Sequence, residues 1–419
     1  MKIAKIFARQ ILDCRGIPTI EVDAVLESDI IGRAAVPSGA STGTHEAVEL
    51  RDSESKNYNG MGVLKAVRNV NQEIAEKIIG MEAEDQKKID EALIELDGTK
   101  KKERLGANAI LGVSMAVCRT ASYTTKQRLF EYIGKLSSNS SFSIPRPMIL
   151  LMEGGMHGNW ASDIQEFMIS PSKKSTFKFD EILYGVHEIF QTLEKLLIEK
   201  NYSTGVGFEG GFCPRELKSN EEAFELIIKA IEKAGYKIGE DFVLAIDFAA
   251  SEFYQDGMYL LKSENEKKYT SQEWKEKVIE WTKNYPIYSL EDPFAEDEWS
   301  EWISIMSEIG EDHQIVGDDL TTTNVSRIKK AIDIKAINSV IIKLNQIGTV
   351  SETIEAVNFS RQAGLQTVVA HRAGETNDDF IADFAVGTGA NQCKFGGLNR
   401  GERIAKYNQL LRIEKLLEN

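Results

Sequence analysis

The segment FVLAID (242–247) ends an apolar run in an aspartate, and this pattern recurs along the second half of the chain. The other segments of this kind are QEFMIS (165–170), VGFEGGF (206–212), IYSLED (287–292), IVGDD (315–319), SVIIKLN (339–345), TVVAHR (367–372) and QCKFGG (392–397). Each has the length and composition of a strand, and helical stretches lie between them. Repeated strand–helix units over this length predict a (β/α)8-type barrel.

Helix signals separate these segments. Ser219 and Glu222 have the spacing of a capping box, and the helical run that follows them ends at Gly235. The stretch TVSETIEAVNFSRQAG (349–364) predicts another helix. In such barrels the chemistry lies at the C-terminal ends of the strands. The ionisable residues that fall at those ends are Asp247, Glu291, Asp318, Lys343, His371 and Lys394.

The first part of the chain has a different pattern. Strands are predicted at KIFARQI (5–11) and TIEVDAVLES (19–28), followed by helices at 63–79 and 108–122. Strands first and helices after favour a small α+β unit. Serine runs and two prolines in SSNSSFSIPRP (137–147) predict a linker. We therefore expect an N-terminal α+β capping domain with a mobile loop over 1–138 and a barrel catalytic domain over 139–419.

Length and charge limit the class of protein. The 419 residues fit two domains, and the net charge of −15 comes without a basic stripe, so we expect no nucleic-acid partner. The N-terminus is too polar for a signal peptide, and no apolar run approaches the roughly 20 residues of a membrane span. Four scattered cysteines predict free thiols. We expect a cytoplasmic protein with no membrane partner, in which metals or placed cations neutralise any anionic substrate.

Asp247, Glu291 and Asp318 each follow an apolar strand. Three carboxylates around one barrel mouth repel one another unless a cation lies between them. Ligands that are all oxygen suit Mg²⁺, which keeps positions open for water and substrate. The alternative is that each carboxylate caps the helix that follows it. Since three successive units show the same feature, the sequence favours a metal site.

Two lysines lie at the ends of predicted strands. Desolvation and nearby positive charge are expected to lower the pKa of Lys343, and a neutral amine can act as a general base. The alternative is a structural pair between Lys343 and one of the carboxylates. Lys394, in NQCKFGG, is a second cation that can bind a carboxylate oxygen of the substrate and push Lys343 further toward neutrality.

Glu166 and Glu209 also lie at strand-like ends. A close pair of carboxylates raises one pKa enough to hold the proton that a general acid needs. The alternative for each is a solvated glutamate. His157 and His371 are candidates for substrate binding, and Arg372 gives His371 a neighbour whose planar fork suits a phosphate.

These residues lie in motifs that resemble the enolase (phosphopyruvate hydratase) family from end to end. The matching stretches include ILDCRGIPTIEVD, VPSGASTGTHEAVELRD, GANAILGVSMAV, DIQEFMI, EGGFCPRELKSNEEAFELI, LAIDFAASEFY, SLEDPFAEDEW, QIVGDDLTTTN, IIKLNQIGTVSETIEA, AHRAGET and AKYNQLLRIE. They are long, specific and in order along the chain. The resemblance implies an enolase-type barrel behind the N-terminal domain.

The resemblance also implies roles. A conformational Mg²⁺ is expected at Asp247, Glu291 and Asp318, and a second Mg²⁺, arriving with substrate, at Ser41. Lys343 is expected to be the base and Glu209 the acid, with Glu166 in support. The family is usually dimeric, and Glu21 and Arg412 match interface positions, so a homodimer or higher homo-oligomer is expected. Substrate contacts are expected from His157, His371, Arg372, Lys394, Gly39 and His45.

Several positions depart from the family pattern beside the expected ligands. Phe208 replaces an aspartate before the catalytic glutamate, and we expect it to desolvate Glu209 and raise its pKa. Glu153 replaces an asparagine and adds negative charge, and Leu150 replaces another asparagine just upstream. Ala373 replaces a serine and removes a donor to phosphate.

Three functions are therefore compared. The first is the reversible dehydration of 2-phosphoglycerate to phosphoenolpyruvate by a Lys base and a Glu acid. The second is a related reaction in a phosphonate pathway, like that of carboxyphosphonoenolpyruvate synthase, on a related phosphoglycerate or phosphonate. The third is a non-catalytic binding protein, which the retained base, acid and metal ligands disfavour. In the first two the partner is a small anionic phosphorylated carboxylate.

Overall fold

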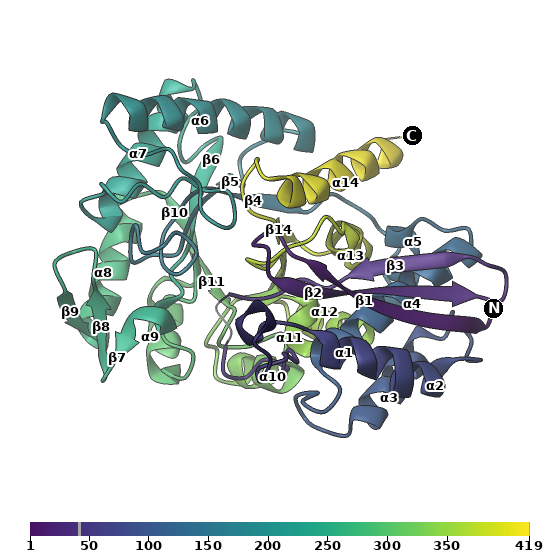
Figure 1. Cartoon of the computed structure of the whole chain (residues 1–419). Coiled ribbons are helices and arrows are strands. Elements are labelled where there is room, and N and C mark those ends of the chain that lie inside the picture. The colour runs from purple at the N-terminus through teal and green to yellow at the C-terminus, as the bar shows by residue number, and fades with distance from the viewer. Residues whose placement is uncertain (41–42, 419) are drawn as a thin grey trace.

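The computed structural model describes residues 1–40 and 43–418, and its N-terminal part is a sheet covered by helices (Figure 1). Strands β1 (Ile3–Leu12), β2 (Pro18–Leu26) and β3 (Ile31–Ala35) form an antiparallel sheet in that order. The first two were predicted, and β3 was not. The sheet packs on α4 (Ala107–Thr124), a helix that is buried along most of its length.

The predicted helix at 63–79 is confirmed as a continuous helical stretch with a wider turn inside it. It consists of α1 (Leu64–Asn69), a π-helical segment (Val70–Ile74) and α2 (Ala75–Ile78). The remaining helices of this part are α3 (Gln86–Asp97), α5 (Leu129–Ser137) and a short 3-10 turn (Asn57–Gly60). The expected linker lies between α5 and the first barrel strand, and the boundary at 138/139 stays a prediction.

Within the described residues, eight strands of the second part close into a barrel. Their order around it is β10-β11-β12-β13-β14-β4-β5-β6. Neighbouring strands run parallel except for β5, which is antiparallel to both β4 and β6. The bounds are β4 (Arg146–Glu153), β5 (Glu166–Pro171), β6 (Phe242–Asp247), β10 (Ile287–Glu291), β11 (Gln314–Gly317), β12 (Ser339–Ile342), β13 (Gln366–Ala370) and β14 (Gln392–Lys394).

One predicted strand was wrong. The segment 206–212 is a loop that touches the end of β4 through one isolated bridge, between Met152 and Phe212. Its glycines favour a turning backbone, and Gly210 has a φ of +93°. The strand in its place is β4, which prediction missed because serines and prolines precede and enter it.

Helices surround the barrel (Figure 1). Two of them, α6 (Phe179–Glu199) and α7 (Asn220–Lys233), lie between β5 and β6 in the chain. The predicted cap of α7 is confirmed, because the Ser219 side chain accepts from the Glu222 N–H at 3.2 Å. The others are α8 (Ser271–Asn284), α9 (Trp299–Ile309), α10 (Val325–Asp333), α11 (Leu344–Ile347), α12 (Val350–Gln362), α13 (Phe380–Thr388) and α14 (Gly401–Leu417).

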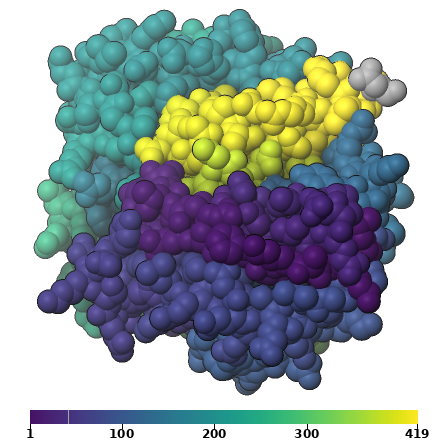
Figure 2. All heavy atoms as spheres, turned by 45° about the vertical axis from the view of Figure 1, so that its right-hand side comes forward, coloured from purple at the N-terminus to yellow at the C-terminus, as the bar shows by residue number. Residues whose placement is uncertain are grey.

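The region between β6 and α8 holds a 3-10 turn (Ala250–Phe253) and a small meander of β7 (Tyr254–Gln255), β8 (Met258–Leu261) and β9 (Lys267–Thr270). Figure 2 shows α14 beside the N-terminal strands on one face of the molecule. No helix in the described part of the chain is both long and apolar enough for a bilayer.

Candidate active site

Four acidic residues lie in one row at the mouth of the barrel. Glu153 pairs in register with Glu166, Glu166 with Asp247, and Asp247 with Glu291. Because β5 runs antiparallel, its first residue lies at the edge where β4, β6 and β10 end. This is why Glu166 reaches the mouth, although it begins its strand.

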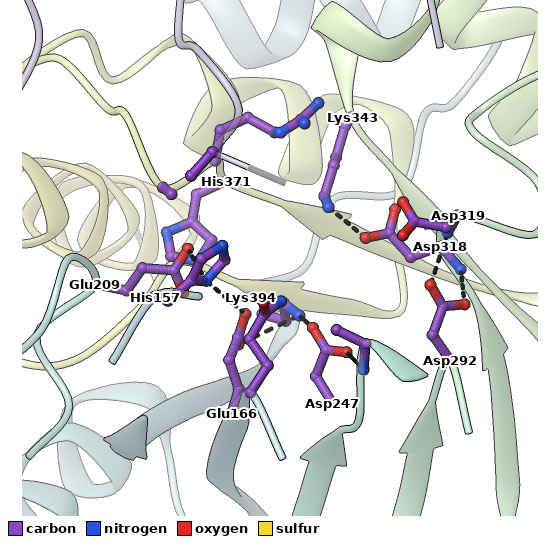
Figure 3. Close-up of a pocket in the computed structure, with 15 residues that line it drawn as sticks. His157, Glu166, Glu209, Asp247, Asp292, Asp318, Asp319, Lys343, His371 and Lys394 are labelled. Carbon is purple, nitrogen blue, oxygen red and sulfur yellow. Dashed lines mark hydrogen bonds and ion pairs between the residues drawn. The ribbon is translucent and has the colours of Figure 1, made fainter. Parts of the chain in front are cut away.

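A pocket at this mouth brings most of the predicted site residues together (Figure 3). Glu291 does not line the pocket itself, but it accepts a hydrogen bond from Lys394, which does. Gly39 and His45 do not line the pocket either. Ser41 lies outside the described residues. The lining residues are Ala40, His157, Gln165, Glu166, Glu209, Asp247, Ala249, Asp292, Asp318, Asp319, Lys343, His371, Arg372, Ala373 and Lys394.

Lys394 forms ion pairs with carboxylates from three strands, β5, β6 and β10. Its Nζ lies 2.9 Å from Asp247, 2.7 Å from Glu291 and 3.2 Å from Glu166. Burial lowers the pKa of Lys394, but the surrounding carboxylates outweigh burial and hold the pKa well above its ordinary value. Asp247 and Glu291 therefore face an ammonium group, and their role as metal ligands stays a prediction.

Lys343 pairs with the third predicted ligand, Asp318. Burial, Arg372 and Lys394 all lower the pKa of Lys343, as expected from the sequence. The carboxylate of Asp318 outweighs them, so the pKa of Lys343 is raised. The expected neutral amine is therefore wrong for this arrangement, in which Lys343 is an ammonium group beside a carboxylate.

A second group of aspartates surrounds Asp318. One carboxylate oxygen from each of Asp292, Asp318 and Asp319 lies within 4.8 Å of the others. Asp292 accepts the backbone N–H groups of Asp318 at 2.9 Å and Asp319 at 2.8 Å, which fixes this turn. Burial and mutual repulsion raise the pKa of Asp292 and Asp319 well above the ordinary range. Asp292 and Asp319 were not predicted as site residues. The two adjacent acidic residues at the end of SLED (289–292) and of VGDD (316–319) are the sequence signal that could have found them.

The opposite side of the pocket holds two histidines around Glu209. His157 Nδ1 lies 3.3 Å from Glu209 Oε1, and His371 Nε2 lies 3.3 Å from Glu209 Oε2. Burial raises the pKa of Glu209, but the histidines bring it well below its ordinary value. Glu166 has the opposite shift, because burial and the charge of Glu209 raise its pKa well above the ordinary value. The expected close pair of carboxylates, Glu166 and Glu209, is therefore present, and of the two Glu166 has the raised pKa.

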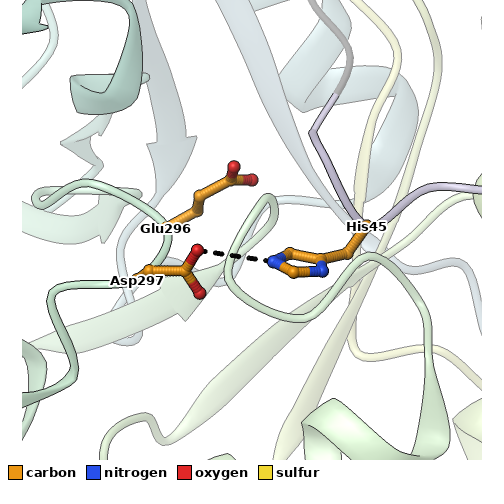
Figure 4. Close-up of side chains that lie close together, drawn as sticks. All are labelled: His45, Glu296 and Asp297. Atoms are coloured by element: carbon orange, nitrogen blue, oxygen red, sulfur yellow. Dashed lines mark hydrogen bonds and ion pairs between the residues drawn. The ribbon is translucent and has the colours of Figure 1, made fainter.

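The loop that follows β3 in the N-terminal part contains three residues with contacts at or near the site. Glu46 pairs with Arg372 at 2.8 Å, and both side chains are buried. His45 instead lies 3.5 Å from Asp297, near Glu296 and on the outside of the pocket (Figure 4). Gly39 accepts from Arg15 at 3.3 Å through its carbonyl oxygen. The substrate contacts expected of His45 and Gly39 stay predictions.

The departures from the family pattern have distinct surroundings. Phe208 is 37% exposed, and the pKa of Glu209 is lowered overall although burial raises it. The expected contribution of Phe208 to that burial stays a prediction. Glu153 is buried, and its oxygens accept the Glu209 N–H at 3.1 and 3.3 Å. Burial and Glu209 raise the pKa of Glu153 well above its ordinary value. Leu150 packs inside the barrel, and Ala373 lines the pocket.

The whole chain matches models of one protein family. Residues 3–133 match "Enolase, N-terminal domain", and residues 141–419 match "Enolase, C-terminal TIM barrel domain". The match agrees with the sheet-and-helix N-terminal part and the closed barrel. It supports an enolase-superfamily lyase and the binding of a divalent metal by the acidic groups at the mouth. The chain belongs to the enolase family.

Proposed function

We propose that the chain catalyses the reversible dehydration of 2-phosphoglycerate to phosphoenolpyruvate. The observation that carries this proposal is the division of one pocket into two sides. Figure 3 shows Lys343 on one side, Glu209 with His157 and His371 on the other, and Lys394 between them. A base and an acid that approach a bound molecule from different sides suit the removal of a proton from one carbon and of hydroxide from the next.

The residues at the mouth fit a divalent cation. Their donors are all oxygen, which suits Mg²⁺. Burial and the charges of neighbouring carboxylates raise the pKa values of Glu291, Asp292 and Asp319, and a cation would relieve that repulsion. We propose Asp318 as a ligand together with Asp247 and Glu291, and Ser41 for a second ion. An ion held there would supply stabilisation of the negative charge that develops on the substrate, and Asp318 would then be shared between the ion and Lys343.

The chain's own residues then have separate tasks. Lys343, once its own proton is lost, takes the proton from the carbon next to the substrate carboxylate. Glu209, once it has taken up a proton, gives it to the leaving hydroxyl, which departs as water, and Glu166, whose pKa is raised, supports it. Arg372 is the proposed phosphate contact, and Lys394 neutralises a carboxylate oxygen. The substrate class is a small phosphorylated carboxylate.

A second candidate is a related phosphoglycerate or phosphonate substrate of a phosphonate pathway. The buried carboxyl group of Glu153 beneath Glu209 favours it, because this group changes the charge around the proposed acid. Ala373 adds to this, since a pocket residue without a hydroxyl cannot donate to a phosphate.

The test is direct turnover of 2-phosphoglycerate with Mg²⁺, followed by the ultraviolet absorbance of phosphoenolpyruvate. Activity in the usual enzyme range of roughly 1–10³ s⁻¹ supports the first candidate. If 2-phosphoglycerate is not turned over while a phosphonate analogue is, the second candidate replaces it. A protein without turnover on either substrate leaves only the binding role.

We also propose a cytoplasmic homodimer. Phe7 and Leu12 are exposed apolar side chains on β1, and Cys14, Cys118, Cys213 and Cys393 are free thiols. Light scattering on the purified protein tests the assembly: a monomer at micromolar concentration contradicts it.

A further inference from the structure

Arg403, near the start of α14, is fully buried and joins the segments that build the acid side of the pocket. Its Nη1 donates to the Arg372 carbonyl oxygen at 2.7 Å, and its Nη2 donates to the carbonyl oxygens of Phe208 at 3.0 Å and Ala373 at 2.6 Å. Since Phe208 directly precedes Glu209, one guanidinium ties the loop of Glu209 to the loop of His371.

The contact between Arg403 and His371 determines where the imidazole carries its proton. Arg403 Nη1 lies 2.7 Å from His371 Nδ1. A guanidinium only donates hydrogen bonds, so Nδ1 must accept. A neutral imidazole has one donor and one acceptor, and Nε2 therefore carries the hydrogen. Burial, together with the charge of Arg403, lowers the pKa of His371 to about 4, which keeps the ring neutral.

We propose that Arg403 is a positioning residue that fixes His371 as its Nε2–H tautomer and thereby selects which oxygen of Glu209 carries the acid's proton. His371 Nε2 lies 3.3 Å from Glu209 Oε2 without forming a well-aligned hydrogen bond, and its N–H at this distance favours negative charge on Oε2. The proton that Glu209 delivers then resides on Oε1, which lies 3.3 Å from His157 Nδ1.

The consequence for the reaction rests on the proposed function. As the carbon–oxygen bond breaks, Oε1 gives its proton to the leaving hydroxyl, which departs as water with the bonding electron pair. The Glu209 carboxylate that remains still faces the Nε2–H of His371. Arg403 itself only donates hydrogen bonds and takes no part in the proton transfer.

The first measurement uses the unmodified protein and does not depend on the substrate. In protein labelled with ¹⁵N-histidine, nitrogen chemical shifts at neutral pH report which ring nitrogen is protonated, and His371→Gln identifies the signal. The expected result is a protonated Nε2 and a bare Nδ1. A protonated Nδ1, alone or with Nε2, overturns the proposal.

The second measurement separates positioning from mere structural support. Arg403→Gln offers both a donor and an acceptor to Nδ1, so the tautomer is no longer fixed. We expect mixed His371 tautomers and a fall in elimination of about 10²-fold, the lower range for a general acid. Exchange of the substrate's α-proton with solvent is expected to persist, because Lys343 lies on the other side. Arg403→Lys retains a donor-only group and is expected to restore the tautomer and most of the elimination.

The control is Arg119→Lys, which alters a partly exposed arginine that is paired with Asp378 and does not line the pocket. It is expected to change neither the tautomer nor the ratio of exchange to elimination. If Arg403→Gln lowers exchange and elimination equally, or leaves the tautomer fixed, the proposal fails. If Arg403→Gln does not fold, the unmodified protein and Arg403→Lys decide. A protein with the expected tautomer but no turnover of 2-phosphoglycerate contradicts the proposed function and not the tautomer.

Discussion

The two sides of the pocket hold their key residues in different ways. On the base side, Lys343 lies against Asp318 and Arg372 against Glu46, so cations and carboxylates neutralise one another. On the acid side, Glu209 lies between His157 and His371, and the pKa of His371 is lowered to about 4 by burial above all. Lys343 is therefore an ammonium group as long as it pairs with Asp318. Glu209, in contrast, has His157 and the uncharged His371 as its neighbours rather than a paired lysine or arginine.

The largest effect is expected from breaking the base side. Lys343→Ala removes the proposed proton acceptor, and turnover is expected to fall by about 10⁴-fold, the upper range for a general base. Exchange of the α-proton with solvent is expected to be lost as well. The matched control is Lys329→Ala, since Lys329 pairs with Asp333 on the surface. Retained exchange in Lys343→Ala assigns the base to another residue.

Removing divalent ions tests whether a bound metal ion at Asp318 is needed to weaken the ion pair between Asp318 and Lys343. After treatment with a chelator, we expect turnover to vanish and to return on addition of Mg²⁺. Bound Mg²⁺ is also expected to raise the melting temperature, because a ligand that binds only the folded state stabilises it. Asp318→Asn is expected to weaken this stabilisation. Full activity in the presence of the chelator contradicts a metal on the base side.

The acid side is expected to give a smaller effect through His371. Its folded pKa of about 4 lies below the value of 6.5 for free histidine, so the unfolded chain binds more protons between these two values. Stability therefore rises with pH across this window, by roughly 3 kcal/mol for this shift, and is lost as the pH falls through it. His371→Gln is expected to flatten that part of the profile in urea unfolding. His313→Gln, at the opposite end of the barrel, is the control, and an unchanged slope in His371→Gln refutes the assignment.

The smallest effect is expected from Glu153→Gln. The amide retains an oxygen for the Glu209 N–H, so the loop stays in place and turnover is expected to change less than about 10-fold, the loss of roughly 1 kcal/mol. The pH profile of elimination is expected to shift, because one carboxyl group beneath Glu209 is removed. Glu414→Gln is the matched control, since Glu414 also accepts a backbone N–H, from Phe179 at 3.0 Å. A large loss of activity gives Glu153 a direct role.

The barrel could be predicted from the sequence because each apolar segment that ends in a charged residue is recognisable from a few consecutive residues. Sequence reasoning missed β4, where Pro145 before the strand and Pro147 within it disfavour a strand, and it misread 206–212, where glycines bend an apolar run into a loop. Most mouth residues were found because they end a strand or directly follow one, whereas Glu166 begins β5 and Glu209 lies in a loop. The net pKa of Lys343 could not be predicted, because it depends on the position of Asp318, a residue 25 places earlier in the chain. The contacts of Arg403 depend in the same way on the packing of α14.

The division of labour between the two sides is tested most directly by Glu209→Gln. With 2-phosphoglycerate and Mg²⁺ in deuterated water, mass spectrometry follows deuterium entering the substrate, and absorbance follows phosphoenolpyruvate. We predict that deuterium still enters at the α-carbon while elimination falls by roughly 10²–10⁴-fold. If exchange stops together with elimination, Lys343 and Glu209 do not act as separate base and acid, and the account is contradicted.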